Sequence, residues 1–240
     1  MKFHLLSDLH LEFYSYTLTN PNNCDALILA GDIGNITKSN YKNLLKSASK
    51  LFKYTFVLKG NHECYNHYVD ETDKIIQGYC NSFNNVYYLN KTVFDIDDIR
   101  IIGSTLWSNI QKTQKEYISM GLNDFELIKH WNIDLQNEQH LTEREFIENE
   151  IKTTNHKKLL IITHHAPSFQ NTSSPEFDNG PMTSAFASNL DYLFDSPITW
   201  CYGHTHFSNT QTIKNTRLFS NQRGYPKEKT NFNKDFTFTL

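Results

Sequence analysis

The segment FHLLSDLH, residues 3–10, joins a short apolar run directly to an Asp-x-His pair. A run of this length is typical of a buried strand, and the sequence turns polar as soon as it ends. The same arrangement recurs along the chain. Apolar runs that are followed at once by small or polar residues lie at 3–6, 26–30, 54–58, 99–103, 159–163 and 199–202. We predict that these runs are strands of an α/β fold.

Helical patterns separate several of these strands. Residues 40–52 and 71–83 each place their apolar side chains on one face, and strand-helix-strand order favours parallel strands joined by right-handed crossovers. Short turn signals separate other runs and predict antiparallel hairpins, namely 86–88 with 92–96 and 99–102, and 210–213 with 216–219.

A helical stretch at about 106–155 interrupts the strand rhythm. Asn123-Asp124 is expected to open one helix, and the capping-box pattern Thr142-Glu143-Arg144-Glu145 another. We interpret the stretch as an insertion within a single domain that spans residues 1–240.

Composition restricts the class of protein. The chain has 240 residues, of which 38% are hydrophobic and 20% charged, as in folded globular proteins. A net charge of -3 gives no global basic field for nucleic acid or anionic membranes, although a local patch for nucleic acid remains compatible with it. The 4 cysteines show no Cys-x-x-Cys spacing, which indicates reduced thiols. The N-terminal apolar run is too short for a signal peptide, and no window reaches the ~20 apolar residues of a membrane span, so we expect a cytoplasmic protein without a membrane partner.

Residue types that bind metals follow five of the predicted strands. In open α/β sheets, ligands gather at the carboxyl ends of the strands, and Asp, Asn and His suit Zn, Mn or Fe. In an extended segment, residues i and i+2 point the same way, so each Asp-x-His or His-x-His pair can face one centre. The residues in question are Asp8 and His10, Asp32, Asn61 and His62, His164 and His165, and His204 and His206.

Each motif has a structural alternative when it is taken alone. Gly31-Asp32 is compatible with a turn or a helix N-cap, and His204-x-His206 with an exposed polar pair. His4 lies inside the first strand and is expected to be packed there. The occurrence of all five motifs at strand ends favours a shared site. Four other histidines are expected to be solvated, namely His67, His130, His140 and His156.

The combined pattern resembles the calcineurin-like metallophosphoesterase superfamily. The quoted motifs are Asp8-Leu9-His10, Gly31-Asp32, Gly60-Asn61-His62-Glu63, His164 and Gly203-His204-Thr205-His206. The resemblance implies two packed mixed β-sheets flanked by helices, a four-layer αββα sandwich, with the site at one edge. It also implies a hydrolase that acts on ester bonds of phosphate.

The resemblance further implies two divalent metal ions, of which Mn, Fe, Zn, Ni and Co all suit the ligands. Asp32 would bridge the ions, and a hydroxide bound to both would attack phosphorus. His62 would stabilise the developing charge or protonate the leaving oxygen, and Glu63 would orient a histidine. One ion would be held by Asp8, His10, Asp32 and His206, and the other by Asp32, Asn61, His164 and His204.

Further residues are candidates for substrate contact. His165 either supports the ligands from behind or faces substrate. Arg223 could bind phosphate and Tyr225 could stack on a base, while the alternative for both is a structural turn with a packed tyrosine. Asn123-Asp124 either faces the metals or caps a helix.

The resemblance is strongest to compact bacterial, phage or viral-type phosphoesterases, at residues 7–13, 163–168 and 221–226. No arginine follows Gly31-Asp32, unlike the Asp-Arg-Gly of the protein Ser/Thr phosphatases. We expect hydrolysis of a phosphodiester, with a nucleotide or another phosphorylated small molecule as substrate. A phosphomonoesterase, a protein phosphatase or a non-catalytic metal-binding scaffold of the same fold is the alternative; the oligomeric state is left open.

Overall fold

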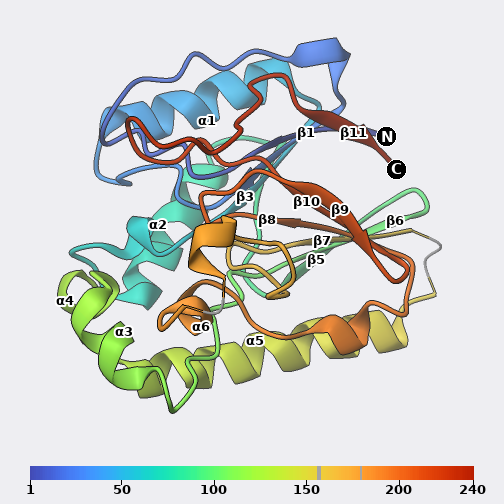
Figure 1. The fold of residues 1–240 in the computed structure, drawn as a ribbon. Helices are drawn as coiled ribbons and strands as arrows, with labels where there is room; N and C mark the ends of the chain where they lie inside the picture. Colours follow the sequence, from blue (N-terminus) through green and yellow to red (C-terminus); the bar gives the residue numbers. More distant parts are fainter. Residues whose placement is uncertain (156–157, 179) are drawn as a thin grey trace.

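Two mixed β-sheets stack face to face, and helices cover the outer side of each sheet (Figure 1). The computed structural model describes residues 1–155, 158–178 and 180–240. This arrangement confirms the expected α/β fold of two packed mixed sheets flanked by helices.

The first sheet has the strand order β11-β1-β2-β3-β4. Strands β1 to β4 run parallel, and β11 pairs antiparallel with β1. A loop with a 3-10 turn joins β1 to β2, while helices α1 (Ser39–Leu51) and α2 (Val69–Cys80) join β2 to β3 and β3 to β4. The strand bounds are β1 Lys2–Leu6, β2 Ala26–Ala30, β3 Tyr54–Leu58, β4 Val86–Tyr88 and β11 Thr237–Thr239.

The second sheet has the order β5-β6-β7-β8-β10-β9. Strands β6, β7, β8 and β10 are parallel, while β5 and β9 pair antiparallel at the two edges. The bounds are β5 Thr92–Ile96, β6 Ile99–Gly103, β7 Lys158–Ile162, β8 Ile198–Tyr202, β9 Thr210–Ile213 and β10 Thr216–Ser220.

Alternation along the strands builds the layers. In β1, Phe3 and Leu5 belong to the apolar core that also contains Ile101 and Leu160 of the second sheet. Leu6 belongs instead to the core beneath α1 and α2. Because successive strand side chains point to opposite faces, one strand supplies both cores and the sheets are covered on both sides.

One predicted hairpin is wrong. Strands β5 and β6 form an antiparallel hairpin, as do β9 and β10, but β4 pairs parallel with β3. The segment 89–91 carries the chain from the first sheet to the second, and the amide of Leu89 still bonds the carbonyl of Val57 at 2.8 Å. A short turn signal thus marks a change of sheet here.

The segment 106–155 is helical only from residue 115 onward. The Thr142 capping box is also wrong, because Thr142 lies inside α5, whose first turn is capped by the Asn132 side chain through the amides of Asp134 and Leu135. The helices are α3 Lys115–Gly121, α4 Asp124–Leu127, α5 Ile133–Thr153 and α6 Thr183–Phe186, with 3-10 turns η1 Pro21–Asn23, η2 His62–Cys64, η3 Pro175–Phe177 and η4 Asp191–Leu193.

None of the helices in the described part of the chain is long and apolar enough to cross a bilayer. All four cysteines are buried and none forms a disulfide.

Candidate active site

The loops that follow β1, β2, β3, β7 and β8 meet at one edge of the two stacked sheets. Because these strands are parallel within each sheet, their carboxyl ends lie at the same rim. The structure brings the predicted ligands together there in two groups of three, and a third group, His10, Asp32 and His62, lies between them. One group is Asp8, His10 and His206, and the other is Asp32, His164 and His204; within each group the ligand atoms lie within 4.8 Å of one another.

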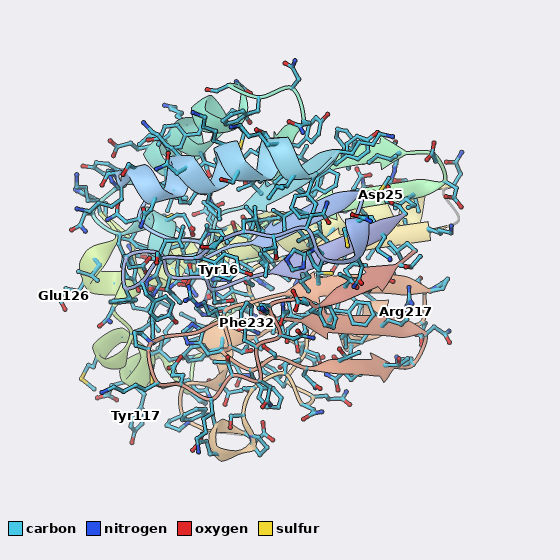
Figure 2. The ribbon with its side chains drawn as sticks, turned by 90° about the horizontal axis from the view of Figure 1, so that it is seen from above. Tyr16, Asp25, Tyr117, Glu126, Arg217 and Phe232 are labelled. Carbon is cyan, nitrogen blue, oxygen red and sulfur yellow. The ribbon has the colours of Figure 1, made fainter. Side chains whose placement is uncertain are left out.

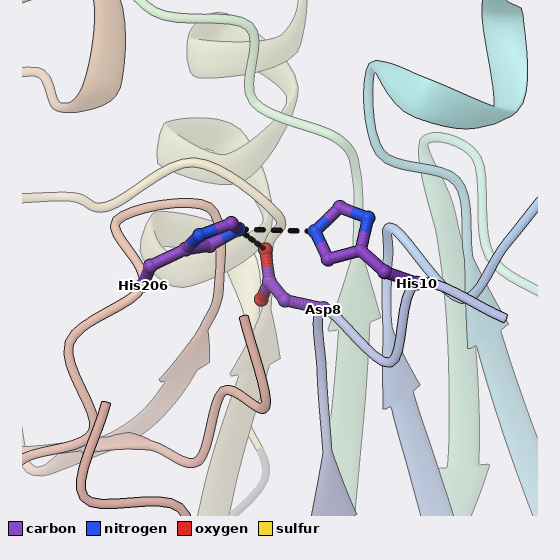
Figure 3. Close-up of side chains that lie close together, drawn as sticks. All are labelled: Asp8, His10 and His206. Carbon is purple, nitrogen blue, oxygen red and sulfur yellow. Dashed lines mark hydrogen bonds and ion pairs between the residues drawn. The ribbon is translucent and has the colours of Figure 1, made fainter. Parts of the chain in front are cut away.

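The first group presents two imidazole nitrogens to each other (Figure 3). The Nε2 atoms of His10 and His206 are 3.0 Å apart, and Nε2 of His206 is 3.5 Å from Oδ1 of Asp8. The opposite nitrogens face carboxylates, Nδ1 of His10 at 2.9 Å from Glu12 and Nδ1 of His206 at 2.6 Å from Glu228. With the proton on Nδ1, each Nε2 keeps a lone pair, and two facing lone pairs beside a carboxylate fit a shared cation.

The second group lies deeper. Nδ1 of His164 donates to the carbonyl of Ala30 at 2.9 Å, so its Nε2 faces Oδ1 of Asn61 at 3.1 Å and Oδ1 of Asp32 at 3.5 Å. Nε2 of His204 is buried and has no hydrogen-bond partner among the described residues. An orphaned buried nitrogen costs about 1–3 kcal/mol, which a coordinated cation would offset. The donor set of this group therefore also fits a divalent metal.

Electrostatics favour positive charge at this position. Burial opposes ionisation of Asp32, but His164 and His62 hold its pKa well below the usual range. Although burial disfavours its charged form, Asp32 raises the pKa of His164 to about 9. Burial and the neighbouring rings of His165 and His164 lower the pKa of His204, which keeps that imidazole in the neutral form that binds metals.

Most of the predicted ligands have a left-handed backbone. Asp8, His10, Asp32, His204 and His206 have φ angles of 52°, 46°, 52°, 71° and 50°. Such a conformation costs about 1–2 kcal/mol for a residue with a Cβ atom, and it is found at functional sites that the surrounding fold stabilises. The prediction that residues i and i+2 face one centre assumed an extended backbone and is wrong in that respect. The side chains converge from tight loops instead.

Glycines beside the ligands leave room for close approach. A Cβ atom at Gly60 would collide with Oδ1 of Asp32 and with the His164 ring, and one at Gly203 would lie 2.7 Å from Oδ2 of Asp8. The loops can pass this close to the ligands only without a side chain.

We expect Gly60→Ala to weaken metal binding at least about tenfold, because a Cβ atom displaces Asp32 and His164 together. Calorimetric titration with Mn²⁺ measures the effect. Gly78→Ala is the matched control, since a Cβ there meets nothing within 4 Å and alanine favours helix α2 by about 1 kcal/mol. Equal Mn²⁺ affinity in both variants would contradict the steric argument.

Glu63 holds two ligand loops together. Its buried carboxylate accepts hydrogen bonds from the amides of Gly60 and Ile33, both at 2.7 Å, and of Asp32 at 3.0 Å and Gly34 at 3.3 Å. Burial and the Asp32 carboxylate raise the pKa of Glu63 to about 7. The expectation that Glu63 orients a histidine is wrong, because the residue positions backbone amides.

Asp124 orients Asn61 from the helical insertion. Its Oδ1 accepts from Nδ2 of Asn61 at 2.8 Å and from the hydroxyl of Tyr65 at 2.9 Å. These bonds leave Oδ1 of Asn61 facing His164, as metal binding requires. Asn123 occupies the N-cap position of α4, which confirms that this pair opens a helix, although the Asn123 side chain makes no cap bond. The sequence singled out Asp124 but gave no signal for its partner Asn61, 63 positions away.

His62 lies above the first group. Its Nδ1 is 3.2 Å from Glu12, its Nε2 is 2.8 Å from the Tyr225 hydroxyl, and the same Nε2 is 3.9 Å from Oδ2 of Asp32. Burial opposes protonation, but Asp32 and Glu12 raise the pKa of His62. Burial likewise opposes ionisation of Glu12, whose bonds from His10 and His62 lower its pKa to about 2. Sequence reasoning missed Glu12, although its place two residues after His10 was a usable signal.

The residues predicted to contact substrate separate into different environments. The His165 side chain is 1% exposed and its ring centroid is 4.0 Å from that of His204, so it lies behind the ligands and does not face the surface. The Arg223 guanidinium stacks 3.7 Å above the Tyr14 ring and donates to the carbonyl of Ser15, an arrangement that fits the structural alternative. Only Tyr225 lies over the site, with its ring 4.5 Å from His10.

The loop that carries Arg223 packs on the loop after β1. Tyr16, which also contacts the guanidinium at 5.3 Å, lies against Phe232 with ring centroids 6.3 Å apart (Figure 2). These contacts position the C-terminal loop, and with it Tyr225 and Glu228, over the metal ligands.

The other histidines divide between packed and surface positions. His4 is buried and bonds the carbonyl of Phe236 at 2.9 Å, as predicted. The prediction that His140 is solvated is wrong, because the residue is buried and its Nδ1 lies 2.7 Å from the carbonyl of Trp107. His156 lies outside the described residues.

Comparison with known proteins agrees with the geometry. A family model described as "Calcineurin-like phosphoesterase" matches residues 1–208. "Uncharacterized protein L509" of Acanthamoeba polyphaga mimivirus is 33% identical over 260 residues, covering 95% of this chain and 92% of the viral protein.

Two solved structures share the fold. Phosphopantetheinyl hydrolase from Mycobacterium tuberculosis has a TM-score of 0.75 at 15% identity, over 94% of this chain and 90% of that chain. A dimetal phosphatase from Danio rerio has a TM-score of 0.53 at 11% identity, over 92% of this chain and 87% of that chain. The chain therefore belongs to the calcineurin-like phosphoesterase family and is a metal-dependent hydrolase of phosphoester bonds.

Proposed function

We propose that the protein is a phosphodiesterase with two divalent cations bridged by Asp32. The observation that supports this most directly is the placement of Asp32. It forms one ligand group with His164 and His204, and its carboxylate also lies within 4.8 Å of a ring nitrogen of His10, a member of the first group. In this proposal Asp8, His10, Asp32 and His206 hold one cation. Asp32, Asn61, His164 and His204 hold the other.

The ligand set provides two buried carboxylates, Asp8 and Asp32, against two divalent charges. The loaded site is therefore positive and attracts a phosphate anion. When bound, the cations supply Lewis-acid activation of the phosphoryl oxygens and of the attacking water. The chain itself contributes the fixed positions of the ligands, which the left-handed loops and the adjacent glycines maintain.

His62 supplies the proton in this proposal. Its raised pKa favours the imidazolium, whose Nδ1–H donates to Glu12 and whose Nε2–H points to the Tyr225 oxygen. A leaving oxygen that takes the place of the Tyr225 hydroxyl would accept that proton as the P–O bond breaks. General acids of this kind contribute about 10²- to 10⁴-fold to the rate.

Charge favours a diester over a monoester. A monoester dianion needs additional cationic donors, yet Arg223 is held against Tyr14, and in the described chain the cleft beside His62 is lined by no lysine or arginine. A diester carries one negative charge and needs fewer cationic donors than a monoester dianion. This difference in charge supports the diester.

We expect the Mn-loaded protein to hydrolyse bis-p-nitrophenyl phosphate with a kcat/KM at least about tenfold above that for p-nitrophenyl phosphate, which corresponds to about 1.4 kcal/mol of transition-state preference. Chelated protein is the control and should be inactive on both. A preference for the monoester would establish the phosphatase alternative, and two bound metals without turnover of either ester would favour the scaffold alternative.

A further inference from the structure

A cleft of about 410 Å³ opens directly beside His62. Its volume lies within the range of small-molecule sites. The walls come from the loops after β1 and β2, from the segment after β3, from helix α4 and its N-terminus, and from the C-terminal loop. The side chains that matter for recognition are three aromatic rings, Phe13, Tyr65 and Tyr225, and three amides, Asn35, Asn66 and Asn123.

The aromatic wall is open to a ligand. Phe13 is 56% exposed, although its edge meets the Tyr225 ring at a centroid distance of 5.5 Å. The Tyr65 ring is tilted by 33° against that of His62 at a centroid distance of 4.3 Å, and its hydroxyl is anchored to Asp124. A large exposed phenylalanine next to the proposed acid is a stacking surface for a planar group, because every nucleobase has a π-face.

On the side of the cleft that carries Asn66 and Asn123, hydrogen bonds fix the backbone and leave the two side chains free. The backbone N–H of Asn66 donates to the backbone carbonyl of Leu127 at 2.7 Å. The backbone carbonyl of Asn123 accepts from the backbone N–H of Leu127 at 2.8 Å. Within the described chain, the side-chain amides of Asn66 and Asn123 make no hydrogen bond. Each offers donors and an acceptor, which match the edge of a heterocycle.

The cleft holds no lysine or arginine to anchor a second anionic group among the lining residues of the described chain. Its Glu12 carboxylate lies 3.2 Å from Nδ1 of His62, so the two charged groups of the cleft face each other. This balance favours an uncharged ligand over a second phosphate or an acidic peptide. His62 lines the cleft and its Nε2 lies 3.9 Å from Oδ2 of Asp32, so a leaving group bound in the cleft would place its oxygen beside His62.

We propose that this cleft binds the leaving nucleoside of a nucleotide diester, with the base stacked on Phe13 and its edge bonded to Asn66 and Asn123. This inference rests on the proposed phosphodiesterase function and adds the identity of the leaving group. The cations and the ligand set act on the phosphate, while the cleft selects an uncharged aromatic heterocycle on the departing side.

Adenosine tests the proposal because it lacks the phosphate group that the cations would bind, so its binding reports on the cleft alone. Calorimetric titration of the Mn-loaded full chain should detect adenosine but not ribose, and adenosine should inhibit hydrolysis of bis-p-nitrophenyl phosphate competitively. Phe13→Ala should weaken adenosine binding at least tenfold. Phe177→Ala is the matched control, since Phe177 is 62% exposed in η3 and should leave the affinity unchanged.

The outcomes separate this inference from the proposed function. If adenosine binds no better than ribose, or if Phe13→Ala and Phe177→Ala bind it equally, the nucleoside assignment fails even when the diester is hydrolysed. If adenosine binds in a Phe13-dependent way but no diester is hydrolysed, the cleft assignment stands and the proposed reaction fails.

Discussion

Replacing Asp32 with asparagine is expected to remove both cations and to lower diester turnover at least about 10³-fold, roughly 4 kcal/mol of transition-state stabilisation. Asparagine has almost the same shape but no charge, and Asp32 is the residue whose carboxylate reaches both ligand groups. Plasma mass spectrometry of the purified protein measures the metal content, and bis-p-nitrophenyl phosphate measures the turnover.

Asp97→Asn is a close control for this variant. Asp97 has the same φ of 52° as Asp32 but is exposed in the turn between β5 and β6. Asparagine tolerates the left-handed region, so neither substitution should unfold the chain through its backbone. An Asp32→Asn protein that retained two equivalents of metal would disprove the bridging role.

The positions of the strands could be predicted because a buried strand is recognisable from its own apolar residues. Runs such as 26–30 and 54–58 coincide with β2 and β3, since a strand covered on both faces must be apolar throughout. The sheet to which a strand belongs, by contrast, could not be predicted from the residues of that strand. Nothing in 86–96 distinguishes a hairpin from a crossing between sheets. Strand β11 is three residues long and is recognised by its pairing with β1.

The predicted ligands were visible for a related reason. Each follows a strand directly, so parallel strands place them at one rim whatever the intervening loops do. The contacts that orient them were hidden, because Glu228 and Asp124 act on His206 and Asn61 through hydrogen bonds that only the folded chain creates. The same holds for Arg223, whose partner Tyr14 lies over 200 positions away in the sequence.

Replacing His62 with alanine is expected to leave metal content unchanged while reducing turnover of a dinucleoside phosphate about 10²- to 10⁴-fold. His62 contributes a proton and no ligand in the proposed assignment, and its ring lies at the cleft with its side chain 11% exposed. The measurement is kcat on the dinucleoside phosphate, together with metal content by mass spectrometry. His67→Ala is the control, because His67 is half-buried and is paired with Glu71 on α2 away from the ligand groups.

The leaving group distinguishes acid catalysis from a general loss of structure. A nucleoside alkoxide is a poor leaving group that needs a proton, whereas p-nitrophenolate is a stable anion that departs without one. His62→Ala should therefore lose far more activity on the dinucleoside phosphate than on bis-p-nitrophenyl phosphate. Equal losses on the two substrates would assign His62 to charge stabilisation of the phosphoryl group, and full activity on both would remove it from the mechanism.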